Sequence, residues 1–130
     1  MIETKVYPVV ISYDEAEKTK YKYLVFIPDL DGYTQGESLA DSIAMARDYL
    51  GTYSLEHELP EPGTIEFNKE DDDTVTLVDI NPAAYKKSLD KTPVKKTLTI
   101  PAYLNNAAIA EGLNFSQTLS EAIKEKLALA

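Results

Sequence analysis

The residues of this sequence with the greatest capacity for chemistry are its carboxylates. Asp29, Asp31 and Asp41 lie close together along the chain, and residues 70–73 (EDDD) form an uninterrupted acidic run. Several carboxylates converging on one point could hold the metal ions of a nuclease. Acidic clusters of this kind are more often solvated turns. We therefore predict no metal site and no enzyme activity, and we keep a residual metal-dependent nuclease as an alternative.

The other residue types that commonly do chemistry are scarce. His57 is the single histidine and the chain has no cysteine, so thiolate metal sites and disulfides are excluded. A lone histidine beside a proline-rich breaker is a poor metal ligand or triad member. The glycines stand singly, and no phosphate-binding or dinucleotide-binding fingerprint occurs. We expect no cofactor.

Composition and charge favour a protein with two tasks. A chain of 130 residues with 44% hydrophobic residues suits one domain or two small ones. No run of about 18 apolar residues predicts a membrane span, and no signal peptide is evident, so we expect a cytoplasmic protein. Residues 82–130 hold seven lysines against four acids, a charge of +3, which leaves −12 on residues 1–81. Chance clustering of surface charge is the alternative explanation.

The front of the chain has the residue pattern of a β-hairpin. Residues 6–13 (VYPVVISY) and 21–28 (YKYLVFIP) predict two strands, and a short third strand is expected at 33–35. In the second strand Val25 and Ile27 point to one face, while Leu24 and Phe26 point to the other. Because both faces are apolar, both need cover. One cover is expected to be a helix, and the other could be a partner protein.

A helix should follow the hairpin and pack on it. Ser38 is a good N-cap, and Leu39, Ile43, Ala46 and Leu50 recur on one helical face. A further strand is predicted at 74–80. Residues 82–92 then read as a linker or a short helix, with Pro82 suited to a first helical turn. We place the domain boundary in this segment.

The last part of the chain has a different pattern. In residues 95–101 (KKTLTIP), Leu98 and Ile100 face one side of a predicted strand, and Lys95, Thr97 and Thr99 face the other. Two helices follow, separated by Gly112 as a left-handed cap, and the second begins at Asn114 or Ser116.

One strand and two short helices cannot close a core, and a lone strand leaves its backbone groups unpaired. Pairing with the same strand of a second chain solves both problems. We therefore predict a homodimer in which four helices cover a two-stranded ribbon. The predicted dimer core consists of apolar residues from the strand and both helices: Leu98, Ile100, Leu104, Leu119, Ile123 and Leu127.

This arrangement resembles the ribbon-helix-helix DNA-binding fold. The resemblance implies that the ribbon enters the major groove and that its outward side chains read bases; here these are Lys95, Thr97 and Thr99. Lys96 is expected at an edge, near phosphate. The start of the second helix would bind a backbone phosphate, and the residues concerned are Asn114, Ser116 and Gln117. A purely structural dimerisation tail and a helix-turn-helix are the alternatives.

The front of the chain resembles HicB-type antitoxins. The similarity is carried by FIPDLDGYTQGESLADSIAMA, in which a hairpin ends at a Pro-Asp turn and Thr-Gln-Gly precedes a Ser-capped helix. Tyr33 departs from the small residue or cysteine that is frequent there. The resemblance implies an α+β chain: a partial ribonuclease H-like (HicB-like) domain at 1–81 without nuclease function, then the ribbon-helix-helix domain at 93–130.

The resemblance also implies partners. A small basic HicA-type toxin that cleaves mRNA would be neutralised by the front domain, and operator DNA would be bound by the tail to repress the shared operon. The candidate toxin-binding residues are acids and tyrosines of the hairpin and its turns: Asp14, Glu15, Tyr21, Tyr23, Asp29, Asp31 and Tyr33. The same tyrosines could instead pack on the helix or on another copy, which would allow a tetramer. A stand-alone repressor with a ligand-sensing front domain is a further alternative.

Overall fold

The chain folds as two compact units. The structure, a computed structural model, describes residues 3–63 and 65–129. Unit 1 is Met1–Lys91 and unit 2 is Thr92–Ala130. The predicted front domain stopped at residue 81, whereas unit 1 also includes the next ten residues, because a helix in this segment packs on it.

Unit 1 is built on a four-stranded antiparallel sheet with the order β3-β2-β1-β4. Its strands are β1 (Lys5–Tyr13), β2 (Tyr23–Ile27), β3 (Gly32–Gly36) and β4 (Thr74–Ile80). The predicted hairpin is confirmed: Val10 lies opposite Phe26 and Tyr13 opposite Tyr23. A 3-10 turn, η1 (Pro28–Leu30), joins β2 to β3. Successive side chains along each strand point to opposite faces of the sheet.

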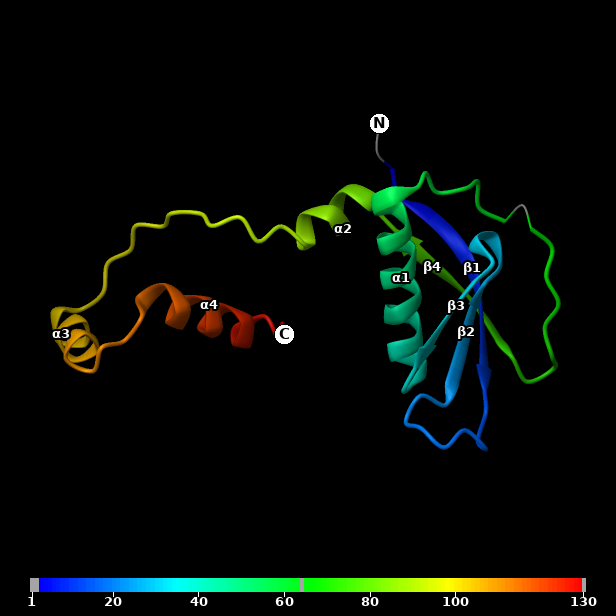
Figure 1. Ribbon diagram of the computed structural model, residues 1–130, viewed down its shortest axis with the longest axis horizontal. Coiled ribbons are helices and arrows are strands. Elements are labelled where there is room, and N and C mark those ends of the chain that lie inside the picture. The colour runs from blue at the N-terminus through cyan, green and yellow to red at the C-terminus, as the bar shows by residue number, and fades with distance from the viewer. Residues whose placement is uncertain (1–2, 64, 130) are drawn as a thin grey trace. The chain divides into compact units, whose positions relative to one another are not determined.

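Helix α1 (Leu39–Glu56) covers one face of this sheet (Figure 1). The predicted N-cap is confirmed, since Ser38 Oγ accepts a hydrogen bond of 3.0 Å from the Asp41 N–H. The Asp41 carboxylate in turn accepts one of 2.8 Å from the Glu37 N–H. Three residues of the predicted apolar stripe pack on the sheet: Ile43, Ala46 and Leu50. Leu39, the first helical residue, was expected to join them but is half exposed.

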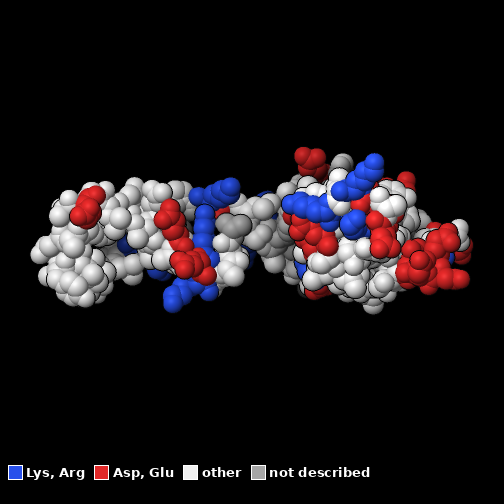
Figure 2. Space-filling view, turned by 90° about the horizontal axis from the view of Figure 1, so that it is seen from below, with Lys and Arg blue, Asp and Glu red and all other residues white. Residues whose placement is uncertain are grey.

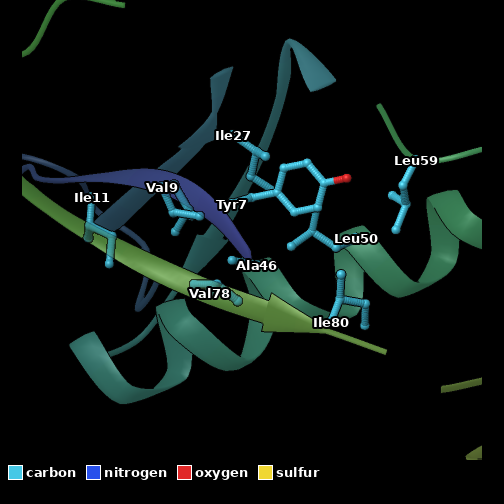
Figure 3. Close-up of a cluster of buried hydrophobic side chains, with 10 residues drawn as sticks. Tyr7, Val9, Ile11, Ile27, Ala46, Leu50, Leu59, Val78 and Ile80 are labelled. Atoms are coloured by element: carbon cyan, nitrogen blue, oxygen red, sulfur yellow. The ribbon is translucent and has the colours of Figure 1, made fainter. Parts of the chain in front are cut away.

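The core of unit 1 lies between α1 and the sheet (Figure 3). Tyr7 sits at its centre with Ile27 and Leu50 around its ring, and its hydroxyl donates a hydrogen bond of 2.5 Å to the Pro60 carbonyl. Burial, with the negative charge of Asp29 and Glu61, raises the pKa of Tyr7 to about 12. The buried cluster comprises Tyr7, Val9, Ile11, Val25, Ile27, Ala46, Leu50, Leu59, Val78 and Ile80.

A short helix, α2 (Pro82–Ser88), packs on α1. Asn81 caps it by accepting a hydrogen bond of 3.1 Å from the Ala84 N–H. The Tyr85 ring lies over Gly51, where a Cβ atom would come within 2.3 Å of the ring. The Tyr85 hydroxyl also donates to Asp48 Oδ1 at 2.7 Å. The absence of a side chain at Gly51 therefore makes room for α2.

Unit 2 contains α3 (Ala102–Ala110) and α4 (Phe115–Lys126). Gly112 ends α3 with φ 68°, as predicted for a left-handed cap. The strand expected at 95–101 is not formed: these residues have no regular structure, and residues 94–100 make no backbone hydrogen bond within the described chain. The physical reason is that a strand requires a partner strand, and a single chain offers none here.

Candidate functional site

The strongest candidate in unit 2 is an apolar cavity of about 760 Å³ between α3, α4 and the segment before α3. Four residues of the predicted dimer core line it: Leu98, Ile100, Leu104 and Leu119. Ala122 and Phe115 also line it, and Phe115 is an apolar residue that sequence reasoning did not include. Ile123, farther along α4, and Leu127, just past its end, were also predicted for the core but do not line the cavity.

This apolar surface is open to solvent. Leu98 is 60% exposed and Ile100 49% exposed, and no described residue of unit 2 is buried. A unit of this size without a buried core cannot be stable alone. Exposed apolar surface of this extent is typical of a surface that another chain covers.

The segment before α3 presents two chemically different sides. Lys96, Leu98 and Ile100 line the cavity, whereas Lys95 and Thr97 do not. Thr99 is likewise absent from the cavity wall, and all of these side chains are exposed. The sides alternate as sequence reasoning expected of a strand, although no ladder is formed.

The start of α4 has unused hydrogen-bond donors. Asn114 caps the helix by accepting a hydrogen bond of 3.0 Å from the Gln117 N–H, and the Gln117 side chain donates to Glu121 at 3.1 Å. Within the described chain the N–H groups of Phe115 and Ser116 make no hydrogen bond. Free amides at a helix N-terminus, aided by the helix dipole, can bind an anion such as a phosphate.

The predicted toxin-binding residues of unit 1 fall into two groups at opposite ends of β2. Asp14, Glu15 and Tyr21 lie in the β1–β2 connection. Tyr23 begins β2 on the face that α1 covers and packs against the core cluster. Its ring also contacts the Tyr13 ring, tilted by 55° at 5.0 Å between ring centroids. Tyr23 therefore packs within unit 1, which was the alternative interpretation for these tyrosines.

Asp29, Asp31 and Tyr33 form the second group, at the β2–β3 turn. Asp29 Oδ2 accepts a hydrogen bond of 3.0 Å from the Gly63 N–H. This bond holds the connection that follows α1 against the β2–β3 turn. Asp31 adopts φ 47° and closes η1 through its N–H to the Pro28 carbonyl. Tyr33 lies on the sheet face away from α1, stacked on Phe26 at 4.7 Å.

Sequence reasoning missed the extent of this second face, which we call the open face. It carries apolar side chains from all four strands, because Val10 lies opposite both Phe26 and Val75. The sequence indicated that Leu24 and Phe26 needed cover. It gave no sign that β4 pairs with β1 and so extends the surface. The open face consists of Val10, Leu24, Phe26, Tyr33, Val75 and Leu77.

Two of the carboxylates considered above stabilise turns of the backbone. Asp29 and Asp41 each accept hydrogen bonds from backbone amides that hold turns in place. Among the described residues, no group of three His, Cys, Asp or Glu side chains could hold a metal ion. His57 follows α1, and its ring packs against the Tyr53 ring, tilted by 38° at 4.8 Å between centroids. No described helix is both long and apolar enough to cross a membrane.

Comparison with known proteins identifies the class of the chain. No protein-family model and no curated protein matches the sequence. The chain is similar to a solved structure described as a toxin–antitoxin complex from Streptococcus pneumoniae, with 30% sequence identity and a TM-score of 0.52. The similarity covers 95% of this chain and 99% of that one. The chain therefore belongs to the same family of toxin–antitoxin proteins.

Proposed function

We propose that the chain is a HicB-type antitoxin of a type II toxin–antitoxin system. In this proposal unit 1 binds and neutralises a small basic HicA-type toxin that cleaves mRNA, and unit 2 forms a ribbon-helix-helix homodimer that binds operator DNA. The observation that carries it is the similarity to a toxin–antitoxin chain over both units. Both partners and the operon would then lie in the cytoplasm.

Charge supports the antitoxin role over the toxin role. The chain carries −9 overall, and unit 1 alone has nine Lys and Arg against nineteen Asp and Glu, a net charge of −10. A strongly acidic surface repels RNA and attracts a basic protein. Figure 2 shows Asp and Glu side chains gathered at one end of unit 1.

The apolar cavity of unit 2 supports the dimer. If the segments before α3 of two chains pair as antiparallel strands, Leu98 and Ile100 of both chains are buried against α3 and α4. Lys95, Thr97 and Thr99 then lie on the outer side of the ribbon, which has the width that a major groove admits. The free amides at the start of α4 would bind phosphate.

Co-expression with the small basic protein encoded beside this chain tests the antitoxin role. The two proteins should co-purify, and growth should be restored in cells that produce the toxin. If the proteins separate and growth stays arrested, the antitoxin role is wrong.

A gel shift at stated salt concentration tests the DNA-binding role. Lys95→Ala should weaken operator binding by about 1–3 kcal/mol if the residue reads a base, while toxin binding survives. Lys124→Ala, in the last turn of α4, removes the same charge away from the ribbon and should have a smaller effect. Equal operator affinity for wild type and Lys95→Ala would remove Lys95 from the reading surface.

A further inference from the structure

The open face is unusual for a sheet that is packed on one side only. Such an antiparallel sheet normally carries polar residues on its exposed face. Here Leu77 is 68% exposed and Tyr33 57% exposed, and Leu24 and Val75 are also exposed. Apolar clusters of this kind mark surfaces that bind another molecule.

The residues of the open face are neighbours across the sheet, with the buried Val10 inside the row and the exposed Tyr33 and Val75 at its ends. Tyr33, Phe26, Val10 and Val75 follow one another across β3, β2, β1 and β4 as directly opposed pairs. Cross-strand partners of this type lie about 4.5–5.5 Å apart. Leu24 and Leu77 each lie two positions along their strands from this row, and hence on the same face.

Acidic side chains adjoin this patch. Residues 70–73 (EDDD) lead directly into β4, which begins at Thr74. Within the described chain the carboxylates of Glu70, Asp71 and Asp72 make no ion pair or hydrogen bond. An apolar centre beside unpaired negative charge is complementary to an apolar patch flanked by lysines and arginines.

We propose that the open face is the surface on which the basic toxin docks. This inference rests on the proposed function and adds the location of the contact. The toxin would place apolar side chains over the row from Tyr33 to Val75, and its basic side chains would meet the acidic run beside β4. The earlier candidates Tyr21 and Tyr23 then lie outside the centre of this interface.

Charge argues against a second copy of unit 1 as the occupant. Two copies would bring a charge of −10 against another −10. Like charges brought together oppose association, whereas a basic partner removes this penalty and is attracted from a distance.

Two substitutions at opposite edges of the sheet test the proposal in the full-length chain. Leu77→Arg on β4 and Tyr33→Lys on β3 place a positive charge on the open face. Leu55→Arg makes the same change at a half-exposed leucine of α1, on the other side of the sheet. The probe is the basic protein encoded beside this chain, purified as a catalytically inactive variant, and its affinity is measured by calorimetry.

The account predicts that Leu77→Arg and Tyr33→Lys each weaken toxin binding at least about tenfold. Leu55→Arg should change it less than about threefold, and thermal unfolding should show all three variants folded. Wild-type affinity in both open-face variants would overturn the docking surface and leave the antitoxin role intact.

Two further outcomes separate the remaining possibilities. If the wild-type chain itself fails to bind the probe, the proposed function is wrong, and the docking proposal that rests on it is wrong as well. If Leu77→Arg instead changes the mass of the chain alone in sedimentation, the open face joins two copies, and the docking proposal is overturned.

Discussion

Unit 1 and unit 2 bury apolar surface in different ways. Unit 1 closes a core of ten residues between α1 and the sheet and leaves one sheet face uncovered. Unit 2 has two helices and a cavity, but none of its described residues is buried. Unit 1 can therefore be stable by itself and use its surplus apolar surface for binding. Unit 2 needs a second chain before it has a core.

The largest expected effect comes from placing a charge in the cavity of unit 2. Leu98→Asp would bury a carboxylate in the dimer without a partner, at a cost of about 3–5 kcal/mol. The dimer dissociation constant should rise by hundredfold or more, as seen by light scattering across a concentration series.

Thr99→Asp is the matched control, because it adds the same charge outside the cavity wall. It should leave the dimer mass unchanged. A wild-type dimer in Leu98→Asp would show that the cavity is not the dimer interface.

A core truncation in unit 1 should lower the stability of that unit and leave dimerisation unchanged. Leu50 is fully buried, so Leu50→Ala should lower the free energy of unfolding of unit 1 by about 2–5 kcal/mol. Dimer mass should not change. Leu55→Ala, on the exposed side of the same helix, should cost less than about 0.5 kcal/mol in urea titrations. Equal effects at the two positions would contradict the packing of α1.

Gly51→Ala tests whether α2 belongs to unit 1. Alanine favours the helix by about 1 kcal/mol over glycine, but its Cβ would collide with the Tyr85 ring. We expect a net loss of about 1–3 kcal/mol. In the Tyr85→Ala background the same substitution should become stabilising. A stabilising Gly51→Ala in the wild-type background would mean that α2 is not docked there.

The smallest effect is expected at Tyr7. Tyr7→Phe removes the hydrogen bond to Pro60 and should cost about 1 kcal/mol at neutral pH. The folded protein keeps the Tyr7 proton up to about pH 12, whereas a tyrosine in the unfolded chain loses it near pH 10. Wild-type stability should therefore fall as pH rises through this window.

The Phe variant lacks that ionisation, so its stability should decline less between pH 10 and 12. Tyr13→Phe, a half-exposed tyrosine, serves as the control. Identical alkaline unfolding of wild type and Tyr7→Phe would contradict a raised pKa at Tyr7.

Local patterns of the sequence predicted the elements of unit 1 well. Alternation located β1, β2 and β4 to within two residues at each end, and Ser38 located the start of α1. These signals depend on neighbours in the sequence, such as a cap and its third following residue. Gly112, which ends α3, was likewise predicted from a local pattern.

Contacts between distant residues could not be predicted in this way. The pairing of β4 with β1, which completes the open face, joins residues about 70 positions apart. The approach of Tyr85 to Gly51 and the bond from Tyr7 to Pro60 also depend on tertiary structure. Sequence reasoning consequently treated residues 82–92 as a linker or short helix and divided its toxin-binding candidates between two ends of β2.

The most direct test of the account is the binding of toxin and of operator DNA by the same Leu98→Asp chain. If the units have separate tasks, this monomeric variant should bind toxin with affinity close to wild type through unit 1. Operator binding should fall at least about a hundredfold, because the ribbon is lost. Loss of toxin binding together with operator binding would contradict the separation of the two surfaces.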